Sequence, residues 1–479
     1  MSVNIHNALV VAAAVVLSIP SASAAYDFVA DGIYYKITDS IANEVDVTYE
    51  SYYAHSSPSY SGAIIIPDSV VYGDVTYAVT AIGECAFYSC GSLTSVEMPG
   101  VTAIGEYAFC FCESLTSVEI PAGVESIEHS AFGACSGLKS VSFSENSKLS
   151  TIGDHAFYCT SLTAVTIPSG VTTIGSHAFF NCTSLAAVTI LSSVTTIGDY
   201  AFDGCESLTS VEMPGVTAIG DYAFFYCTSL ASVEIPAGVE SIEDYTFAFS
   251  GLKSVSFSEN SKLSTIGECA FIHCTSLAAV TIPSSVTTIS DNAFSQCTSL
   301  AAVTMPSSVT TIGDYAFYYC TSLAAVTIPS SVTTIGDYAF YRCDSLVDVY
   351  SINPTPPYAY GYSFGRTTYR TGTLHVPATA VEIYASTYPW SNFTNIEGDA
   401  ESGIHSGEAD ATEPAITARD GAIEVSGIDG GTVNVYSTSG ALVATGEASG
   451  SAINVPGNGI YIVRINAGDY EIARKVAVR

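Results

Sequence analysis

The chain has 479 residues and a formal net charge of −33 at pH 7, from 46 acidic and 13 basic side chains. A field of this sign repels the phosphates of nucleic acids and the surface of anionic membranes, which bind proteins mainly through Lys and Arg. Nucleic acid and membrane surfaces are therefore excluded as partners, which leaves proteins, glycans and small molecules.

An apolar run from Ala8 to Ile19 opens the chain and is followed by small residues at positions 21–24. This arrangement predicts a secretory signal peptide, residues 1–24, cleaved after Ala24. The run is shorter than the ~20 residues that span a bilayer, and no other run in the sequence reaches that length. The mature chain is therefore expected to be exported, without insertion into a membrane.

Twelve near-copies of the phrase I-G-x-x-A-F-x-x-C-x-S-L-x-x-V-x-I-P occupy residues 82–350. Their phenylalanines recur every 22 to 25 residues, from Phe87 to Phe340. A unit of this length cannot bury its apolar face alone, whereas stacked units share a continuous core. The alternation in V-x-I predicts one short strand per coil, ended by the following Pro. The sequence thus predicts a mainly β solenoid of about twelve coils.

A second, longer repeat lies over the first. Residues 92–101 return at 207–216, and residues 140–149 return at 254–263, offsets of 115 and 114 residues. A block of five coils was therefore duplicated. Copying at this fidelity would multiply a catalytic centre as well, so it favours a protein that gains from length over one built around a single reaction site.

The outward position of each predicted strand is mostly Glu or Thr. A solenoid presents such strands as an extended surface on which ligands lie, so these residues form the predicted ligand-binding face. The alternative is a solvated strand surface stabilised by cross-strand Thr contacts. The predicted binding residues are Glu97, Glu119, Thr166, Thr189, Glu212, Glu234, Thr281, Thr304 and Thr327.

An acid follows the repeat Ile by two positions in ten coils. Its carboxylate is expected to cap a short helical turn of its own coil by accepting backbone amides. The alternative is a stack of carboxylates that collects Ca²⁺, although the repeat lacks the dense Asp, Asn and Gly cluster of dedicated calcium loops. No other cofactor is indicated. The ten acids are Glu84, Glu106, Asp154, Asp199, Asp221, Asp244, Glu268, Asp291, Asp314 and Asp337.

Eleven of the fourteen cysteines follow the repeat Phe by three residues, or by two at Cys159 in a shortened coil. They are predicted to be buried thiols that fill the turn, rather than disulfides or zinc ligands. Cys85, Cys110 and Cys269 lie outside this row and are expected to be free or paired thiols.

Aromatic residues recur one position after the acid, mostly as Tyr, with His155 and His177 in the same slot. They are expected to cover the outer side of the core; the alternative is a surface that grips carbohydrate or protein. The chain carries no G-x-S-x-G, H-E-x-x-H, P-loop or dinucleotide fingerprint. No catalytic residue is therefore assigned, and enzyme activity is not expected.

The repeat resembles the BspA-like branch of the leucine-rich repeat family, whose units carry A-F-x-x-C followed by L-x-x-I-x-I-P. The likeness covers all twelve coils, and residues 27–36, 75–83, 354–357, 373–377 and 390–393 resemble the family's flanking segments. The resemblance implies a curved solenoid with an N-terminal β cap, residues 25–81, and an exit cap, residues 351–396. It also implies an exported surface protein that binds host proteins or other microbes.

Residues 397–413 hold six acids and no Lys or Arg, which predicts a flexible acidic linker. Short alternating runs between Gly, Ser, Asn and Asp then predict a small β-sandwich, residues 414–479. Within it, residues 434–440, 459–464 and 474–479 resemble the sorting domain of type IX secretion. That resemblance implies display on the surface of a Gram-negative bacterium.

Together these features predict a non-catalytic, monomeric surface protein that binds an extracellular protein or glycan along its strand face, in the manner of an adhesin. The alternative is a passive spacer or coat component whose repeats matter for length alone.

Overall fold

The computed structural model describes residues 25–50 and 60–398, and in the C-terminal segment residues 415–419, 422–426, 432–437, 442–447, 452–455, 459–467 and 470–478. The predicted signal peptide, residues 1–24, and residues 399–413 of the predicted linker lie outside the described residues. The chain divides into two compact units, Met1–Gly403 and Ile404–Arg479, which are described separately.

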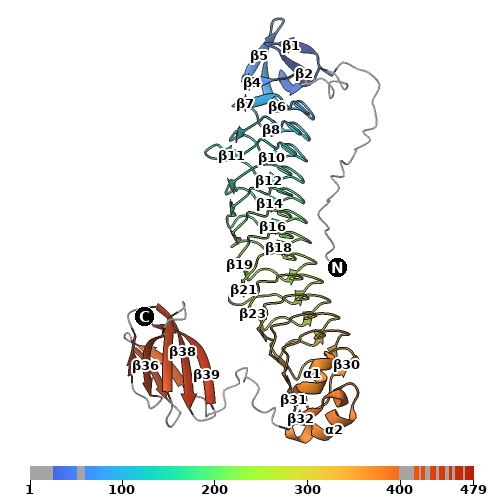
Figure 1. Ribbon diagram of the computed structural model, residues 1–479. Coiled ribbons are helices and arrows are strands. Elements are labelled where there is room, and N and C mark those ends of the chain that lie inside the picture. Colours follow the sequence, from blue (N-terminus) through green and yellow to red (C-terminus); the bar gives the residue numbers. More distant parts are fainter. Residues whose placement is uncertain are drawn as a thin grey trace. The chain divides into compact units, whose positions relative to one another are not determined.

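The first unit is a stack of coils (Figure 1) whose longer strands form a parallel ladder along one side. Equivalent residues of successive coils lie side by side, as in the pairing of Val165 with Val188. The outward and inward positions alternate between exposed and buried, as the V-x-I pattern predicts. The strands of this ladder are β4 (Gly62–Ile65), β7 (Leu93–Glu97), β9 (Ser117–Ile120), β11 (Ser140–Phe143), β13 (Ala164–Thr166), β15 (Ala187–Thr189), β17 (Ser210–Glu212), β19 (Ser232–Ile235), β21 (Ser254–Phe257), β23 (Ala279–Thr281), β25 (Ala302–Thr304), β27 (Ala325–Ile328), β29 (Asp348–Ser351), β31 (Thr373–His375) and β32 (Asn395–Glu397).

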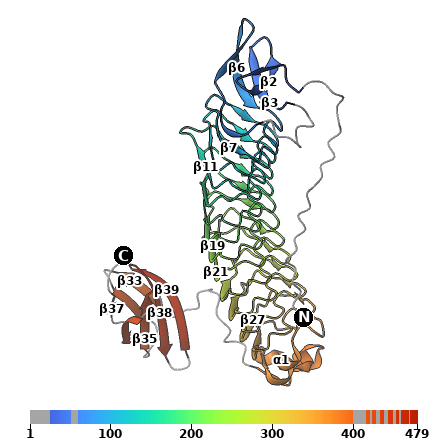
Figure 2. The same cartoon turned by 45° about the horizontal axis from the view of Figure 1, so that its top comes forward.

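Each coil also carries a second, two-residue strand, so the prediction of one strand per coil was wrong. A Thr or its equivalent faces outward and the following Ile is buried, but the run is too short to show a period before the chain turns at Gly or its equivalent. After β6 (Val75–Ile82) these strands are β8 (Ala103–Ile104), β10 (Ser126–Ile127), β12 (Thr151–Ile152), β14 (Thr173–Ile174), β16 (Thr196–Ile197), β18 (Ala218–Ile219), β20 (Ser241–Ile242), β22 (Thr265–Ile266), β24 (Thr288–Ile289), β26 (Thr311–Ile312), β28 (Thr334–Ile335) and β30 (Tyr358–Ala359). Figure 2 shows β11, β19 and β21 along one side of the stack in a second view.

The repeat phenylalanines form the axis of the core. Their rings stack from coil to coil with centroids 4.9 to 5.5 Å apart, and each ring is fully buried. The stack continues past the twelve repeat copies, because Phe364 packs 5.3 Å from Phe340. Such aromatic pairs contribute about 0.5–1.5 kcal/mol each beyond the burial of their area. The predicted mainly β solenoid is therefore confirmed, and it extends into the exit segment.

Aromatic side chains close both ends of this core. At the first end Tyr60 packs 4.6 Å from Phe87 and its hydroxyl donates to the Thr48 carbonyl at 2.6 Å. The strands around it are β1 (Phe28–Ala30), β2 (Ile33–Asp39), β3 (Glu44–Thr48) and β5 (Ser69–Tyr72). At the other end Trp390 packs against Phe364 and donates from its indole nitrogen to the Pro357 carbonyl. The helices there are α1 (Arg366–Thr371), η2 (Ala378–Ala380), α2 (Val381–Ser386) and η3 (Trp390–Asn392).

The second unit contains two antiparallel sheets, which agrees with the predicted β-sandwich. One sheet has the order β33-β34-β37 and the other β36-β35-β38-β39. Buried apolar residues come from both sheets, for example Ile423 and Ile453 from the first and Val433 and Val463 from the second. The strands are β33 (Ala415–Arg419), β34 (Ala422–Ser426), β35 (Thr432–Ser437), β36 (Leu442–Glu447), β37 (Ala452–Asn454), β38 (Gly459–Ala467) and β39 (Tyr470–Val478).

Candidate functional site

The outward residues of the longer strands form a continuous row along the solenoid, which we call the strand face. Register pairs place Thr189 between Thr166 and Glu212, and Thr281 beside Thr304. All nine predicted binding residues lie in this row. Eight of them are exposed, and the ninth, Thr327, is half-buried. The structure therefore brings the predicted residues together as an extended surface.

Two of the four acidic positions of the strand face are held by serines of the neighbouring coil. Ser144 donates from its hydroxyl to Glu119 Oε1 at 2.7 Å, and Ser258 donates to Glu234 Oε1 at the same distance. Both serines lie one coil further along the chain. A hydrogen bond to a charged acceptor restrains the carboxylate, so these two acids present a fixed negative charge to a ligand.

Coils four and five, and again coils nine to eleven, offer a different surface, made of Ala and Thr. Ala164 pairs with Ala187, Ala279 pairs with Ala302, and Ala325 follows in the next strand at the equivalent position. Because the side chains are short, a ligand approaching these stretches comes close to the backbone, with threonine hydroxyls as donors and acceptors. The strand face thus alternates between acidic stretches and stretches of small, hydroxyl-bearing residues.

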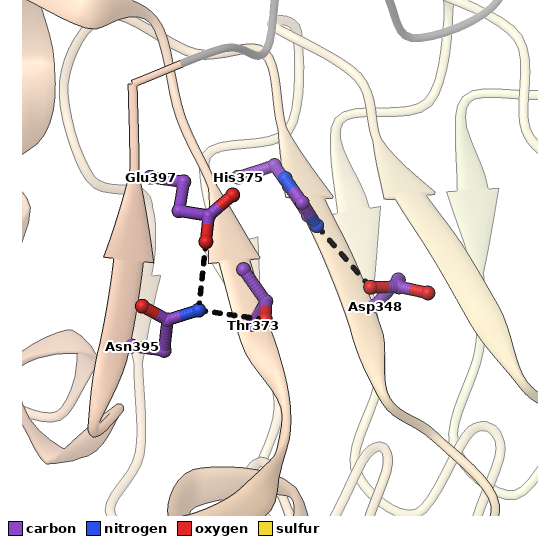
Figure 3. Close-up of polar contacts among 5 residues, drawn as sticks. All are labelled: Asp348, Thr373, His375, Asn395 and Glu397. Carbon is purple, nitrogen blue, oxygen red and sulfur yellow. Dashed lines mark hydrogen bonds and ion pairs between the residues drawn. The ribbon is translucent and has the colours of Figure 1, made fainter.

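The strand face ends in a polar and aromatic group on β29, β31 and β32, which we call the exit cluster (Figure 3). His375 Nε2 lies 3.2 Å from Asp348 Oδ1, a hydrogen bond that becomes an ion pair when the imidazole is protonated. The His375 ring stacks on that of Tyr350 at 4.3 Å. The members of the exit cluster are Asp348, Tyr350, Thr373, His375, Asn395 and Glu397.

A hydrogen-bonded amide links the last two strands of this cluster. Asn395 Nδ2 donates to Thr373 Oγ1 and to Glu397 Oε1, both at 2.9 Å. The exit cluster was not predicted, because its strands do not carry the repeat phrase. The available signal was the order Leu374, His375, Val376, Pro377, which repeats the alternation and terminal Pro of the coils.

The row of acids after the repeat Ile makes a contact that differs from the prediction. Six of the ten carboxylates accept a backbone amide of the next coil instead of capping their own turn. Asp291 Oδ1 accepts from the amide of Asp314 at 2.7 Å, and Asp314 Oδ1 accepts from the amide of Asp337 at 2.6 Å. The same contact is made by Asp154, Asp199, Asp221 and Asp244. Asp337 differs, because it accepts the amide of Tyr338 in its own turn. These six aspartates therefore join coils.

The cysteine row is buried, as predicted, and its hydrogen bonds also run between coils. Cys297 Sγ donates to the Phe271 carbonyl at 3.2 Å, and eight other cysteines make the equivalent contact. Thr160 and Ser250 take the place of Cys in two coils. Cys159 was wrongly assigned to this row, because it is half-exposed and precedes Thr160.

All fourteen cysteines are free thiols. Cys85, Cys110 and Cys269, the three outside the row, are buried, and burial raises the pKa of the Cys85 and Cys110 thiols to about 12. A thiol with such a pKa is protonated at neutral pH and is a weak nucleophile.

The aromatic residues after the acids stack into a ladder along the turns. His155 and His177 lie 4.5 Å apart with nearly parallel rings, and Tyr200 continues the stack at 4.6 Å from His177. Burial, followed by the charges of His177 and His129, lowers the pKa of His155 to about 4. The two histidines are therefore neutral at pH 7 and behave as part of the aromatic surface.

Within the described ranges, no group of three or more His, Cys, Asp or Glu side chains is placed to hold a metal ion. Those residues also include no helix that combines the length and apolar character needed to cross a bilayer. What the geometry offers is an extended surface of exposed hydroxyls and carboxylates, anchored at one end by the exit cluster.

These features define a leucine-rich repeat solenoid, and comparison with known proteins gives the family. The BspA type leucine rich repeat region (6 copies) matches residues 69–186, 150–264 and 256–370, which is more than half of the chain. The chain belongs to this family. A search of the curated proteins gives no significant match.

Several solved structures are similar. A leucine-rich repeat protein from Bacteroides ovatus is 29% identical, with a TM-score of 0.60, over 78% of this chain and 99% of that one. A leucine rich cell surface protein from Faecalibacterium prausnitzii is 25% identical, with a TM-score of 0.45, over 80% of this chain and 100% of that one. A leucine-rich repeat protein of T. pallidum is 30% identical, with a TM-score of 0.37, over 43% and 90%.

The Bacteroides ovatus structure supports the solenoid fold over the 78% of this chain that it matches. Membership of the family suggests a role in protein interaction. Leucine-rich repeat proteins are generally not enzymes.

Proposed function

We propose that this chain is an exported surface protein that holds an extracellular protein or glycan along the strand face. The observation that carries the proposal is the register of the longer strands, which aligns predicted residues of neighbouring coils and places Thr327 beside Tyr350 of the exit cluster. Many weak polar contacts along one row add to a useful affinity only if the row is rigid, because each mobile side chain costs ordering entropy. Coils joined through backbone, cysteine and aspartate contacts provide that rigidity.

The exit cluster is the anchor of this surface. Binding energy in interfaces is concentrated in a few aromatic and charged groups surrounded by weaker contacts. Tyr350 stacks on His375, and His375 is held by Asp348, so the aromatic pair is fixed before a ligand arrives. The neighbouring coils, which present Ala and Thr on the strand face, add flat contact area for the ligand.

Export and display rest on separate features of the sequence. The apolar run from Ala8 to Ile19 supports a signal peptide, and the C-terminal resemblance to a type IX sorting domain supports anchoring at the surface of a Gram-negative bacterium. In this proposal the C-terminal sandwich directs export and the solenoid binds.

The test is a binding screen of the whole chain against extracellular matrix proteins, mucins and glycans. The strand-face variant carries Thr281→Lys, Thr304→Lys and Thr327→Lys. A matched control carries Lys at Thr287, Thr310 and Thr333, which are exposed threonines of the same stretch on the short-strand side. Loss of binding in the first variant alone supports the proposal.

Two outcomes contradict it. Equal loss in both variants would mean that the contact lies elsewhere or that the substitutions act through stability. If the natural chain bound none of the matrix proteins, mucins and glycans, the result would favour the passive spacer, whose repeats matter only for length.

A further inference from the structure

A group of six tyrosines, which we call the tyrosine patch, occupies the turns after β26 and β28 and the equivalent turn of the exit segment. Tyr338 stacks on Tyr315 at 4.9 Å and on Tyr362 at 5.2 Å. A second row packs edge-on against the first, with Tyr318 5.6 Å from Tyr315. The members of the tyrosine patch are Tyr315, Tyr318, Tyr319, Tyr338, Tyr341 and Tyr362. These turns precede the longer strands and are separate from the strand face.

Half of the tyrosine patch is more exposed than the rest of the aromatic ladder. Tyr362 is 59% exposed, Tyr319 is 38% exposed and Tyr315 is 36% exposed. Tyr318, Tyr338 and Tyr341 are half-buried, as are Tyr200 and Tyr222 in earlier coils. Within residues 25–50 and 60–398, Tyr72 and Phe111 are the only exposed Phe, Tyr or Trp side chains outside residues 315–388. The exposed aromatic area of the solenoid is thus concentrated beside its exit end.

Two fixed carboxylates lie next to the patch. The Oδ1 atoms of Asp314 and Asp337 accept the amides of Asp337 and Tyr338, which orients both groups. Asp337 acts on the patch itself, because burial and then the charge of Asp337 raise the pKa of Tyr338. The carboxylates therefore bring negative charge to this central member of the patch.

One cation already uses this surface. The guanidinium of Arg342 lies 6.0 Å from the centre of the Tyr319 ring, in the geometry of a cation–π contact. The stacked rings of Tyr315, Tyr338 and Tyr362 turn their faces toward one another, so they offer edges and hydroxyl oxygens to a partner. Sugar rings bind to free aromatic faces, whereas ammonium and guanidinium groups donate to hydroxyl and carboxylate oxygens.

We propose that the tyrosine patch is a second interaction surface, which binds a Lys- and Arg-rich segment of a partner protein. The apolar stems of Lys and Arg pack against the ring edges while their charged ends reach Asp314 and Asp337. The sign of the patch matches this partner. The surface acts independently of the strand face, so failure of either proposal leaves the other standing.

The test uses the whole chain and a decapeptide of alternating lysine and serine, with a dissociation constant measured by calorimetry. Because an acidic chain attracts any cationic peptide, the measurement is made at about 0.15 M salt, where charges further than ~8 Å away are largely screened. The substitutions that test the patch leave the net charge of the chain unchanged. Tyr315→Asn and Tyr338→Asn are combined, since Asn292 occupies the equivalent left-handed position in an earlier coil with φ 57°.

The matched control combines Tyr200→Asn and Tyr222→Asn, which alter the same stack away from the patch. We expect binding about fivefold weaker in the patch variant and unchanged within about twofold in the control. Arg342→Gln, which removes the competing cation, is expected to strengthen binding about twofold. Circular dichroism checks that each variant is folded.

Three results would overturn the proposal. The patch and control variants losing equal affinity would indicate general attraction to the acidic chain. If the natural chain did not bind the peptide, the proposed Lys- and Arg-rich partner would be wrong. Binding of neutral oligosaccharides that is lost in the patch variant, with no effect on the peptide, would assign the surface to glycans instead.

Discussion

The cysteine row gives the sharpest test of how the coils are joined, and Cys297 is the position to change. Its side chain is fully buried, and its Sγ donates to the Phe271 carbonyl at 3.2 Å. The same carbonyl accepts the amide of Cys274 at 3.1 Å, so the thiol supplies the second of its two hydrogen bonds. Cys297→Ala removes both the donor and the sulfur volume, whereas Cys297→Ser keeps a donor.

The expected magnitudes separate the two variants. Loss of the buried sulfur costs about 1 kcal/mol, comparable to one methylene group, and loss of the hydrogen bond costs about 1 kcal/mol more. Cys297→Ala should therefore lower the free energy of unfolding by about 2 kcal/mol. Cys297→Ser should lower it by about 1 kcal/mol or less, because the hydroxyl donates in place of the thiol. Thr160 and Ser250 already fill this position in two coils.

Urea unfolding followed by circular dichroism measures the difference, and amide exchange in the neighbouring coils localises it, because the coils of a solenoid open partly independently. Cys159→Ala is the control; its side chain is half-exposed and should change stability by less than about 0.5 kcal/mol. If Cys297→Ala were as stable as Cys297→Ser, the thiol would act only as an apolar filler.

Four further variants, at three positions, test buried ionisable groups and the contacts between coils. The pKa of His155 is lowered to about 4 by burial, so the unfolded chain binds its proton first, and stability is lost as pH falls from about 6.5 to 4; His155→Tyr should reduce the drop in melting temperature over that range. Burial raises the pKa of Asp203 from 3.8 to about 7, so its charged form weakens the folded state as pH rises through that interval. Asp203→Asn should therefore raise the melting temperature at pH 8 and change it little at pH 4. Asp314→Ala should lower the free energy of unfolding by about 1 kcal/mol, and Asp314→Asn by less, because the amide oxygen still accepts from Asp337.

Each of these has a clear contrary result. An unchanged acid profile in His155→Tyr would mean that other groups set the acid limit. An equal gain for Asp203→Asn at both pH values would point to packing rather than ionisation. Equal loss from the two Asp314 variants would show that the carboxylate charge, and not its hydrogen bond, joins the coils.

The phase of the repeat made most of the fold predictable. Phe, Leu and Ile recur at fixed positions, so the inward residues and the outward row could be assigned before any coordinates. The nine predicted binding residues lie where the V-x-I alternation placed them. Their role in binding stays a prediction.

What the sequence did not reveal depends on partners one coil away. Asp314 reads as a local cap, because only the stacked structure brings the amide of Asp337, 23 residues on, within reach. Cys159 reads as a member of the cysteine row, because the shortened coil hides that Thr160 holds the equivalent place. The exit cluster was missed for the opposite reason: His375 and Glu397 continue the strands without the repeat phrase.

The contacts between coils determine how the number of coils can change in evolution. Each coil presents backbone amides and carbonyls to the next at the same positions, most coils add a thiol, and six add a carboxylate; the terminal aromatic closures are separate from these contacts. Unequal recombination between equivalent coils would therefore insert or delete whole units without disturbing either closure. A block of five would change the length of the stack by about 24 Å, so copy number sets the length of the solenoid in steps of one coil.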